Sequence, residues 1–170
     1  QIGSKIYSDK FDNKQFEFTI NKDFLNKSIL QKYSQYSEIK LKKFVDKSLE
    51  NFFNIELIKN IFPNAKFIHT FRNPLDSAIS IYQSMLPDLS WTHNFEDILL
   101  YMDHYRKVLK YFKSKYPDLI LDINLEEFTK KSEELSKKMF KFCGLAWNEN
   151  IHNFYKRKDL YSKTLSFNQI

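Results

Sequence analysis

The stretch NAKFIHTFRNPLDSAISIYQ, residues 64–83, decides the fold of this chain. Its first half, KFIHTF at 66–71, is largely apolar and rich in β-formers, which predicts a buried strand. Pro74 then stands where a helix would begin, and a first helical turn does not need the N–H that proline lacks. The stretch therefore predicts a strand that turns directly into a helix, with Arg72 in the turn between them.

The same patterns predict further elements on both sides of this unit. Ser48 stands where it would cap a helix, and Gly144 where it would end one. Strands that alternate with helices predict an α/β fold with a parallel sheet, and the apolar strands predict a sheet covered on both faces. Apolar spacing predicts helices over about 22–38, 49–62, 95–116, 131–143 and 148–156, and strands over about 42–46 and 119–123.

Two cations follow the first two predicted strands. Lys47 comes directly after 42–46 and Arg72 directly after 66–71. In a parallel α/β sheet, ligands bind beyond the carboxyl ends of the strands, so both cations are expected at the ligand edge. A guanidinium has a planar fork of donors that matches phosphate oxygens, and the helix that starts near Pro74 adds its positive dipole end and free N–H groups. The sequence thus points to an anion site.

A serine can complete such a site from the following helix. Ser80 lies about two turns along, and its hydroxyl can donate to a phosphate beside the helix. Ser77, on the same helical face, is an alternative donor. The spacing alone also allows Arg72 to be an ordinary solvent-facing arginine.

Composition narrows the classes of function. The chain of 170 residues has 42% apolar residues, which is typical of a folded domain, and no apolar run of the roughly 20 residues that would span a membrane. Its net charge of +6 comes mostly from lysine, so a solvated surface explains it as well as an anionic partner does. With two glycines it contains neither glycine-rich phosphate-loop pattern, and its one cysteine excludes an internal disulfide.

The histidines and one acidic pair do not predict a site of their own. His69 alternates with Phe67 and Phe71 in a strand, which favours a packed core histidine over a catalytic base. The other histidines lack partners at metal-ligand spacing, so no metal is expected. Glu126 and Glu127 would face opposite sides of a strand, so capping or surface roles are expected for them.

Several stretches together resemble a known family. FPNAKFIHTFRNPLDSAISIY is similar to the strand–turn–helix that binds the 3′-phosphate of the cofactor in sulfotransferases dependent on 3′-phosphoadenosine 5′-phosphosulfate (PAPS). VDKSLENFFNIELIKNIFPNA, FCGLAWNENIHNFY and SKTLSFNQI extend the resemblance over about residues 40–170, while 1–39 match weakly. The likeness is greatest to bacterial sulfotransferases that often follow tetratricopeptide repeats, which are relatives of the protein-tyrosine sulfotransferases.

The resemblance implies a fold and an activity. The fold would be a three-layer, P-loop-type α/β domain with a parallel sheet. The activity would move a sulfuryl group from PAPS to a hydroxyl, or less often an amine, and release 3′,5′-adenosine bisphosphate. By position in the motifs, Arg72 and Ser80 would hold the 3′-phosphate, Lys47 would lie near the transferring sulfuryl group, and Ser166 would touch the cofactor from the far side.

The chemistry is consistent with a lysine at this position. Sulfuryl transfer, like phosphoryl transfer, depends mainly on positioning and charge stabilisation along a line of attack. An ammonium group such as that of Lys47 can neutralise charge that grows on the bridging oxygen, while a separate base takes the acceptor's proton. The alternative is a surface lysine paired with Asp46 or Glu50.

The sequence also departs from the family. It lacks the P-x-S-G-T-T-like loop that grips the 5′-phosphosulfate, it begins with Gln1, and it ends at Ile170, where the family has a basic segment. We therefore expect a single partial domain over 1–170, a C-terminal fragment of a longer protein. Ser84 and Leu125 stand where relatives have an arginine and a tyrosine, so each removes one cofactor contact.

Two other classes of function stay open. A domain that keeps the 3′-phosphate half without the phosphate loop would be a non-catalytic nucleotide-binding or interaction module. Aromatic and basic stretches would suit nucleic acid, but aromatics at helical spacing more often form core, so no nucleic-acid partner is expected. The acceptor, whether protein tyrosine, carbohydrate or small molecule, is not specified by these residues. Tetratricopeptide repeats in the whole protein and a cytoplasmic location fit the resemblance.

Overall fold

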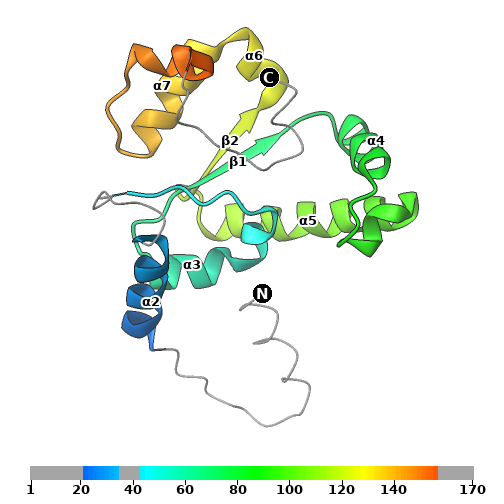
Figure 1. Ribbon diagram of the computed structural model, residues 1–170, viewed down its shortest axis with the longest axis horizontal. Helices are drawn as coiled ribbons and strands as arrows, with labels where there is room; N and C mark the ends of the chain where they lie inside the picture. The colour runs from blue at the N-terminus through cyan, green and yellow to red at the C-terminus, as the bar shows by residue number, and fades with distance from the viewer. Residues whose placement is uncertain (1–20, 35–42, 157–170) are drawn as a thin grey trace. The chain divides into compact units, whose positions relative to one another are not determined.

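The computed structural model describes residues 21–34 and 43–156 (Figure 1). The chain divides into two compact units, with the boundary between Pro63 and Asn64. None of the helices within the described ranges is both long enough and apolar enough to cross a bilayer. The predicted anion site falls in the second unit, apart from Lys47.

The regular elements in the described part of the first unit are helices. They are α2 (Lys22–Ser34), the 3₁₀ helix η1 (Leu49–Asn54) and α3 (Ile55–Ile61). The side chain of Asn26 donates to the carbonyl of Ile61 at 2.9 Å and so ties α2 to α3. Among the described residues of this unit, Ile55 and Ile61 are the buried apolar ones, which agrees with the apolar spacing that predicts a helix here.

Two sequence predictions for the first unit are wrong. Residues 43–48 form no regular structure, where the sequence predicts the end of a strand, and Val45 is 92% exposed. A strand needs a partner for its backbone groups, and among the described residues the sheet consists of β1 (Phe67–Phe71) and β2 (Ile120–Asn124), so this segment has no strand beside it. The single helix expected over 49–62 is a 3₁₀ helix followed by an α-helix, because Asn54 has φ −107° and ψ 11°, outside the α region. Ser48 occupies the N-cap position, but its side chain makes no capping bond.

The second unit is an α/β arrangement with a small parallel sheet. Strands β1 and β2 pair in parallel, with Phe67 opposite Ile120 and Phe71 opposite Asn124. The chain between the two strands is helical, as a parallel connection requires. The elements are β1 (Phe67–Phe71), α4 (Pro74–Ser84), η2 (Ser90–His93), α5 (Phe95–Lys115), β2 (Ile120–Asn124), α6 (Leu125–Lys130), α7 (Ser132–Phe142) and the 3₁₀ helix η3 (Glu149–Lys156).

The core of this unit lies between the sheet and its helices. α7 packs against β2 and α4 packs against α5. The prediction that both faces of the strands are covered is wrong for β1, where Ile68 is 36% exposed. Ile68 alternates with His69, so only the face that bears His69 lies under α5. In the part of this unit that the structure describes, residues 64–156, the buried apolar residues are Ala78, Ile98, Leu109, Phe112, Ile120, Ile123 and Leu135.

A proline and a glycine mark two helix ends, as the sequence predicts. Pro74 is the first residue of α4, as predicted. Gly144 has φ 60° just after α7, and its N–H donates to the carbonyl of Lys141 while that of Leu145 donates to Phe140. This pair of bonds is a Schellman motif, which needs a residue in the left-handed region and therefore favours glycine. The prediction that Gly144 ends this helix is confirmed.

Candidate functional site

A pocket of about 450 Å³ opens at the carboxyl ends of the two strands. This is the edge at which the sequence predicts an anion site. The pocket is bordered by two turns, the one between β1 and α4 and the one between β2 and α6. Its lining residues are Phe71, Arg72, Asn73, Pro74, Asp76, Asn124 and Glu126.

Arg72 lies in the first of these turns, and its side chain is directed along the start of α4. Its Nε donates to the hydroxyl of Ser77 at 3.3 Å, and one terminal nitrogen lies 3.5 Å from the carbonyl of Asp76. The Ser77 hydroxyl in turn donates to the carbonyl of Asn73 at 3.0 Å. The structure thus pairs Arg72 with Ser77, the alternative serine of the sequence analysis.

Ser80 lies about one turn further along α4 and does not line the pocket. Its carbonyl accepts a hydrogen bond from the hydroxyl of Ser84 at 2.7 Å. Ser84 is the residue that stands where relatives carry an arginine, and here it bonds back to its own helix instead. The structure therefore brings Arg72 and Ser77 together and leaves Ser80 on the neighbouring turn.

The start of α4 supplies fewer free donors than the sequence suggests. Pro74 has no N–H, and the N–H of Leu75 donates to the side chain of Asn73 at 2.9 Å. The N–H of Asn73 itself donates to a carboxylate oxygen of Glu126 at 2.8 Å. The expectation of free N–H groups at this helix start is thus corrected, because Asn73 acts as the N-cap and Glu126 takes its amide.

Glu126 is a pocket residue that sequence reasoning placed in a strand with a capping or surface role. It lies in the first turn of α6, so β2 ends before it, at Asn124. The hydrogen bond from the Asn73 N–H lowers the pKa of the Glu126 carboxyl, and the nearby charge of Arg72 acts in the same direction. The pocket lining thus contains two acidic residues, Asp76 and Glu126, and one arginine, Arg72.

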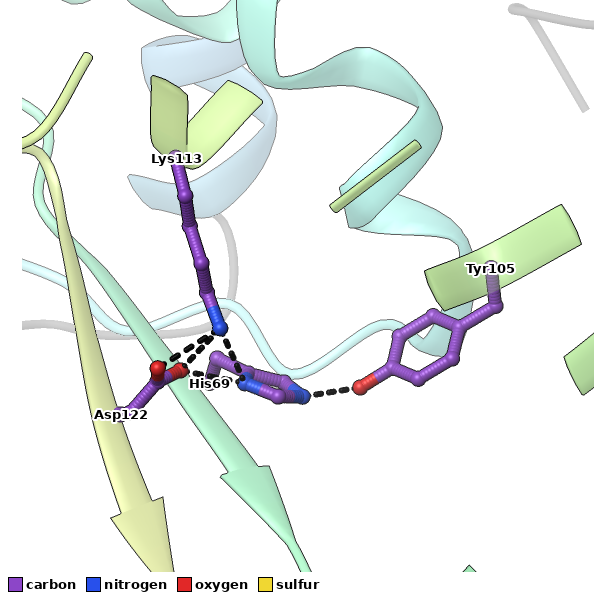
Figure 2. A network of polar contacts seen from close by, with 4 residues as sticks. All are labelled: His69, Tyr105, Lys113 and Asp122. Carbon is purple, nitrogen blue, oxygen red and sulfur yellow. Dashed lines mark hydrogen bonds and ion pairs between the residues drawn. The ribbon is translucent and has the colours of Figure 1, made fainter. Parts of the chain in front are cut away.

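A second polar cluster lies on the face of the sheet that meets α5 (Figure 2). His69 and Asp122 are register partners on the two strands, and the His69 Nδ1 lies 2.6 Å from a carboxylate oxygen of Asp122. The Lys113 ammonium, from α5, lies 2.6 Å from one oxygen of Asp122 and 2.7 Å from the other. The hydroxyl of Tyr105, also on α5, contacts the His69 Nε2.

These contacts assign the state of the His69 ring. The Nδ1 lies 2.6 Å from the Asp122 carboxylate, which only accepts, and 3.4 Å from the Lys113 ammonium, which only donates. The shorter contact indicates that Nδ1 carries the proton and donates to Asp122, so the Nε2 of a neutral ring accepts from Tyr105. Burial lowers the pKa of His69; the bond to Asp122 raises it and the Lys113 charge lowers it, with a net lowering. Burial, with the Asp122 charge, raises the pKa of Tyr105 to about 12. The lowered pKa favours the neutral form of His69, with both ring nitrogens engaged.

Comparison with known proteins settles which family this chain is in. A family model described as "Sulfotransferase family" matches residues 7–149. The chain belongs to the sulfotransferase family. It is 33% identical over 132 residues to an uncharacterized protein of Aquifex aeolicus, an alignment that covers 75% of this chain and 17% of that protein. The chain thus spans less than a fifth of the length of that relative. No solved structure matches it.

The two remaining predicted site residues are Lys47 and Ser166. Lys47 belongs to the first unit, where it is exposed and follows an irregular segment instead of a strand. Ser166 lies outside the described residues. Within the ranges that are described, no group of three or more His, Cys, Asp and Glu side chains is arranged to hold a metal ion.

The His69 cluster should make the stability of this chain depend on pH. The pKa of His69 is held below its ordinary value of 6.5, so the unfolded state takes up a proton at a higher pH than the folded state does. The free energy of unfolding should therefore fall as the pH drops below about 6.5, and level off below the folded-state pKa. Urea titrations above and below this range measure the slope.

Two glutamine variants separate this cluster from the other histidines. His69→Gln should lose most of the slope, since an amide can donate and accept without titrating. His104→Gln, on the exposed side of α5, should keep it. A His69→Gln protein whose urea midpoint changes with pH as steeply as the wild type would contradict the role given to His69.

Proposed function

We propose that the whole protein transfers a sulfuryl group from PAPS to a hydroxyl, or less often an amine, of an acceptor. Membership of the sulfotransferase family supports transfer of this kind. The observation that carries the proposal is Arg72, which lines the pocket at the carboxyl end of β1 beside the start of α4. A guanidinium in this place suits a phosphate group of a nucleotide.

In the proposed complex the 3′-phosphate lies against Arg72. The guanidinium would bind two phosphate oxygens in place of its present contacts with Ser77 and the Asp76 carbonyl. The Ser77 hydroxyl is then close enough to serve the same phosphate, and Ser80 would donate from the next turn. Ser166 would contact the cofactor from its other side. The whole domain would have the three-layer, P-loop-type fold of the family.

Lys47 has the proposed catalytic role. The oxygen of the acceptor forms a bond to sulfur while the bond from sulfur to the phosphate oxygen breaks, and 3′,5′-adenosine bisphosphate leaves. The leaving oxygen gains negative charge during this step, and the Lys47 ammonium would neutralise it. The acceptor's proton goes to a base, for which we propose no residue of this chain.

A second function is favoured by the charges of the pocket. The lining contains two acidic residues, Asp76 and Glu126, and one arginine, and two negative charges near the pocket would oppose a doubly charged phosphate. A nucleotide-binding or interaction module without catalysis would tolerate the resulting weak binding. Acceptor transfer distinguishes this module from the enzyme.

Calorimetry with 3′,5′-adenosine bisphosphate tests the proposal on the whole protein. We expect this nucleotide to bind about 10- to 100-fold more tightly than adenosine 5′-monophosphate, because hydrogen bonds to a charged group contribute about 1.5–3 kcal/mol. Transfer of labelled sulfuryl from PAPS to tyrosine peptides, carbohydrates and small alcohols is measured in parallel. Binding without transfer to any of these favours the second function, and equal affinity for the two nucleotides would refute a 3′-phosphate site.

A further inference from the structure

The two turns that border the pocket are joined by one charged hydrogen bond. Phe71 and Asn124 are the last register partners of the sheet, and beyond them the chain leaves each strand for a helix. Past this point a carboxylate oxygen of Glu126, from α6, accepts the backbone N–H of Asn73 at 2.8 Å. A bond between an amide and an ionised carboxylate is shorter and stronger than one between neutral groups.

Asn73 connects this bond to Arg72. It follows Arg72 directly in the chain, and its side chain caps α4 by accepting from the N–H of Leu75 at 2.9 Å. Its carbonyl accepts from the Ser77 hydroxyl, and that hydroxyl accepts from the Arg72 Nε. A shift of the Asn73 backbone would therefore move the backbone of Arg72, to which it is bonded. It would also move the Ser77 hydroxyl, which contacts the Arg72 side chain.

Glu126 is itself held in place by the start of its helix. Asn124 caps α6 by accepting the N–H of Glu127 at 2.8 Å, and the carbonyl of Glu126 accepts from the Thr129 hydroxyl at 2.8 Å. The carboxylate is thus fixed by β2 and α6, while the amide that it holds belongs to the turn after β1. Glu126 therefore holds the turn that carries Arg72 from an element other than α4.

We propose that Glu126 is a positioning residue for the anion site: by holding the N–H of Asn73 it keeps the turn after β1 in the geometry in which Arg72 faces the pocket. The proposal rests on the proposed function, because it assigns Glu126 a part in binding the 3′-phosphate. It acts through Asn73 and makes no contact with the phosphate itself.

Whether a substitution of Glu126 weakens or strengthens nucleotide binding distinguishes a positioning role from a repulsive one. Glu126 also lines the pocket, so its charge repels a phosphate there. If repulsion or competition for the Asn73 N–H dominated, removing the carboxylate would tighten nucleotide binding. If positioning dominates, removing it loosens binding, and an amide that still accepts a hydrogen bond restores it.

The first measurement is the affinity of variants of the whole protein for 3′,5′-adenosine bisphosphate. Glu126→Ala should weaken binding about 10-fold, and Glu126→Gln should stay within about threefold of the wild type, because its amide oxygen still accepts. Glu127→Ala is the matched control and should leave binding unchanged. The Glu127 carboxylate lies 3.5 Å from the Lys131 ammonium, four residues along the chain, and does not line the pocket. Tighter binding by either Glu126 variant, or an equal loss in Glu127→Ala, overturns the proposal.

A second measurement does not depend on the nucleotide. Arginine labelled with ¹⁵N gives an Nε–H signal for Arg72, which an Arg72→Lys variant identifies, and its exchange with solvent reports how firmly the side chain is held. In the nucleotide-free protein we expect faster exchange in Glu126→Ala and no change in Glu127→Ala. If the wild type binds no nucleotide, the proposed function fails while this exchange rate still decides the role of Glu126. An unchanged Arg72 signal in Glu126→Ala overturns that role.

Discussion

Replacing Arg72 with alanine is expected to weaken the binding of 3′,5′-adenosine bisphosphate about 100-fold. Arg72 is the guanidinium that lines the pocket, whose lining also includes the acidic residues Asp76 and Glu126. A bidentate contact with phosphate supplies two charge-assisted hydrogen bonds, and a loss of about 3 kcal/mol corresponds to about 100-fold in the dissociation constant. With the guanidinium gone, Asp76 and Glu126 would also repel the phosphate without opposition. Calorimetry on the whole protein measures the change.

Two further variants sharpen this result. Arg106→Ala removes the same charge from an exposed position on α5 and should leave binding within about twofold, because screened surface charges contribute little. Arg72→Lys keeps the charge but loses the planar fork, so its affinity should lie between those of the wild type and Arg72→Ala. If Arg72→Ala bound the nucleotide as well as Arg106→Ala does, Arg72 would not be the phosphate ligand.

Lys47→Ala should lower turnover about 100- to 1000-fold while the affinity for 3′,5′-adenosine bisphosphate changes little. The proposed role of Lys47 is to neutralise charge that appears only as the bond from sulfur to oxygen breaks, so the loss should fall on the transition state. Single-turnover measurements with PAPS and an accepted acceptor separate the chemical step from binding.

A neighbouring lysine provides the control for this experiment. Lys43 is exposed in the same irregular segment, and Lys43→Ala should keep nearly full turnover. A Lys47→Ala protein with full turnover would refute the catalytic role. Equal losses in turnover and nucleotide affinity would instead indicate that Lys47 helps to bind the cofactor in the ground state.

The sequence was informative wherever local chemistry decides the structure. The helix that starts at Pro74 and the turn at Gly144 depend on residues within a few positions, and both are present. The apolar stretch at 67–71 is also a strand, and it has β2 as its partner. The segment at 43–48 shows the limit. Phe44 and Val45 resemble a short strand, but a strand exists only where a neighbour accepts its backbone, and local apolar residues do not specify that neighbour.

In the candidate site, too, local features could be predicted from the sequence and long-range contacts could not. Arg72 lies just after β1 and before α4, as the sequence predicts, because the end of a strand and the start of a helix are local signals. Its pairing with Ser77 depends on the rotamer of the arginine, which spacing along the helix does not determine. The contacts of Glu126 with Asn73, and of His69 with Asp122, depend on the register between two distant strands. A carboxylate just after the second strand was the visible signal for Glu126.

The pairing of β1 with β2 also bears on how this unit folds. Each pair of register partners, such as Phe67 and Ile120, is 53 residues apart in the chain. Helices α4 and α5 can form from local contacts, but closing so long a loop requires a large loss of chain entropy before the strands gain anything in return. We therefore expect the mouth of the pocket, which needs both strand ends, to be assembled late on the folding pathway. A nucleotide bound there would leave the rate of folding nearly unchanged and would mainly slow the unfolding of the finished protein.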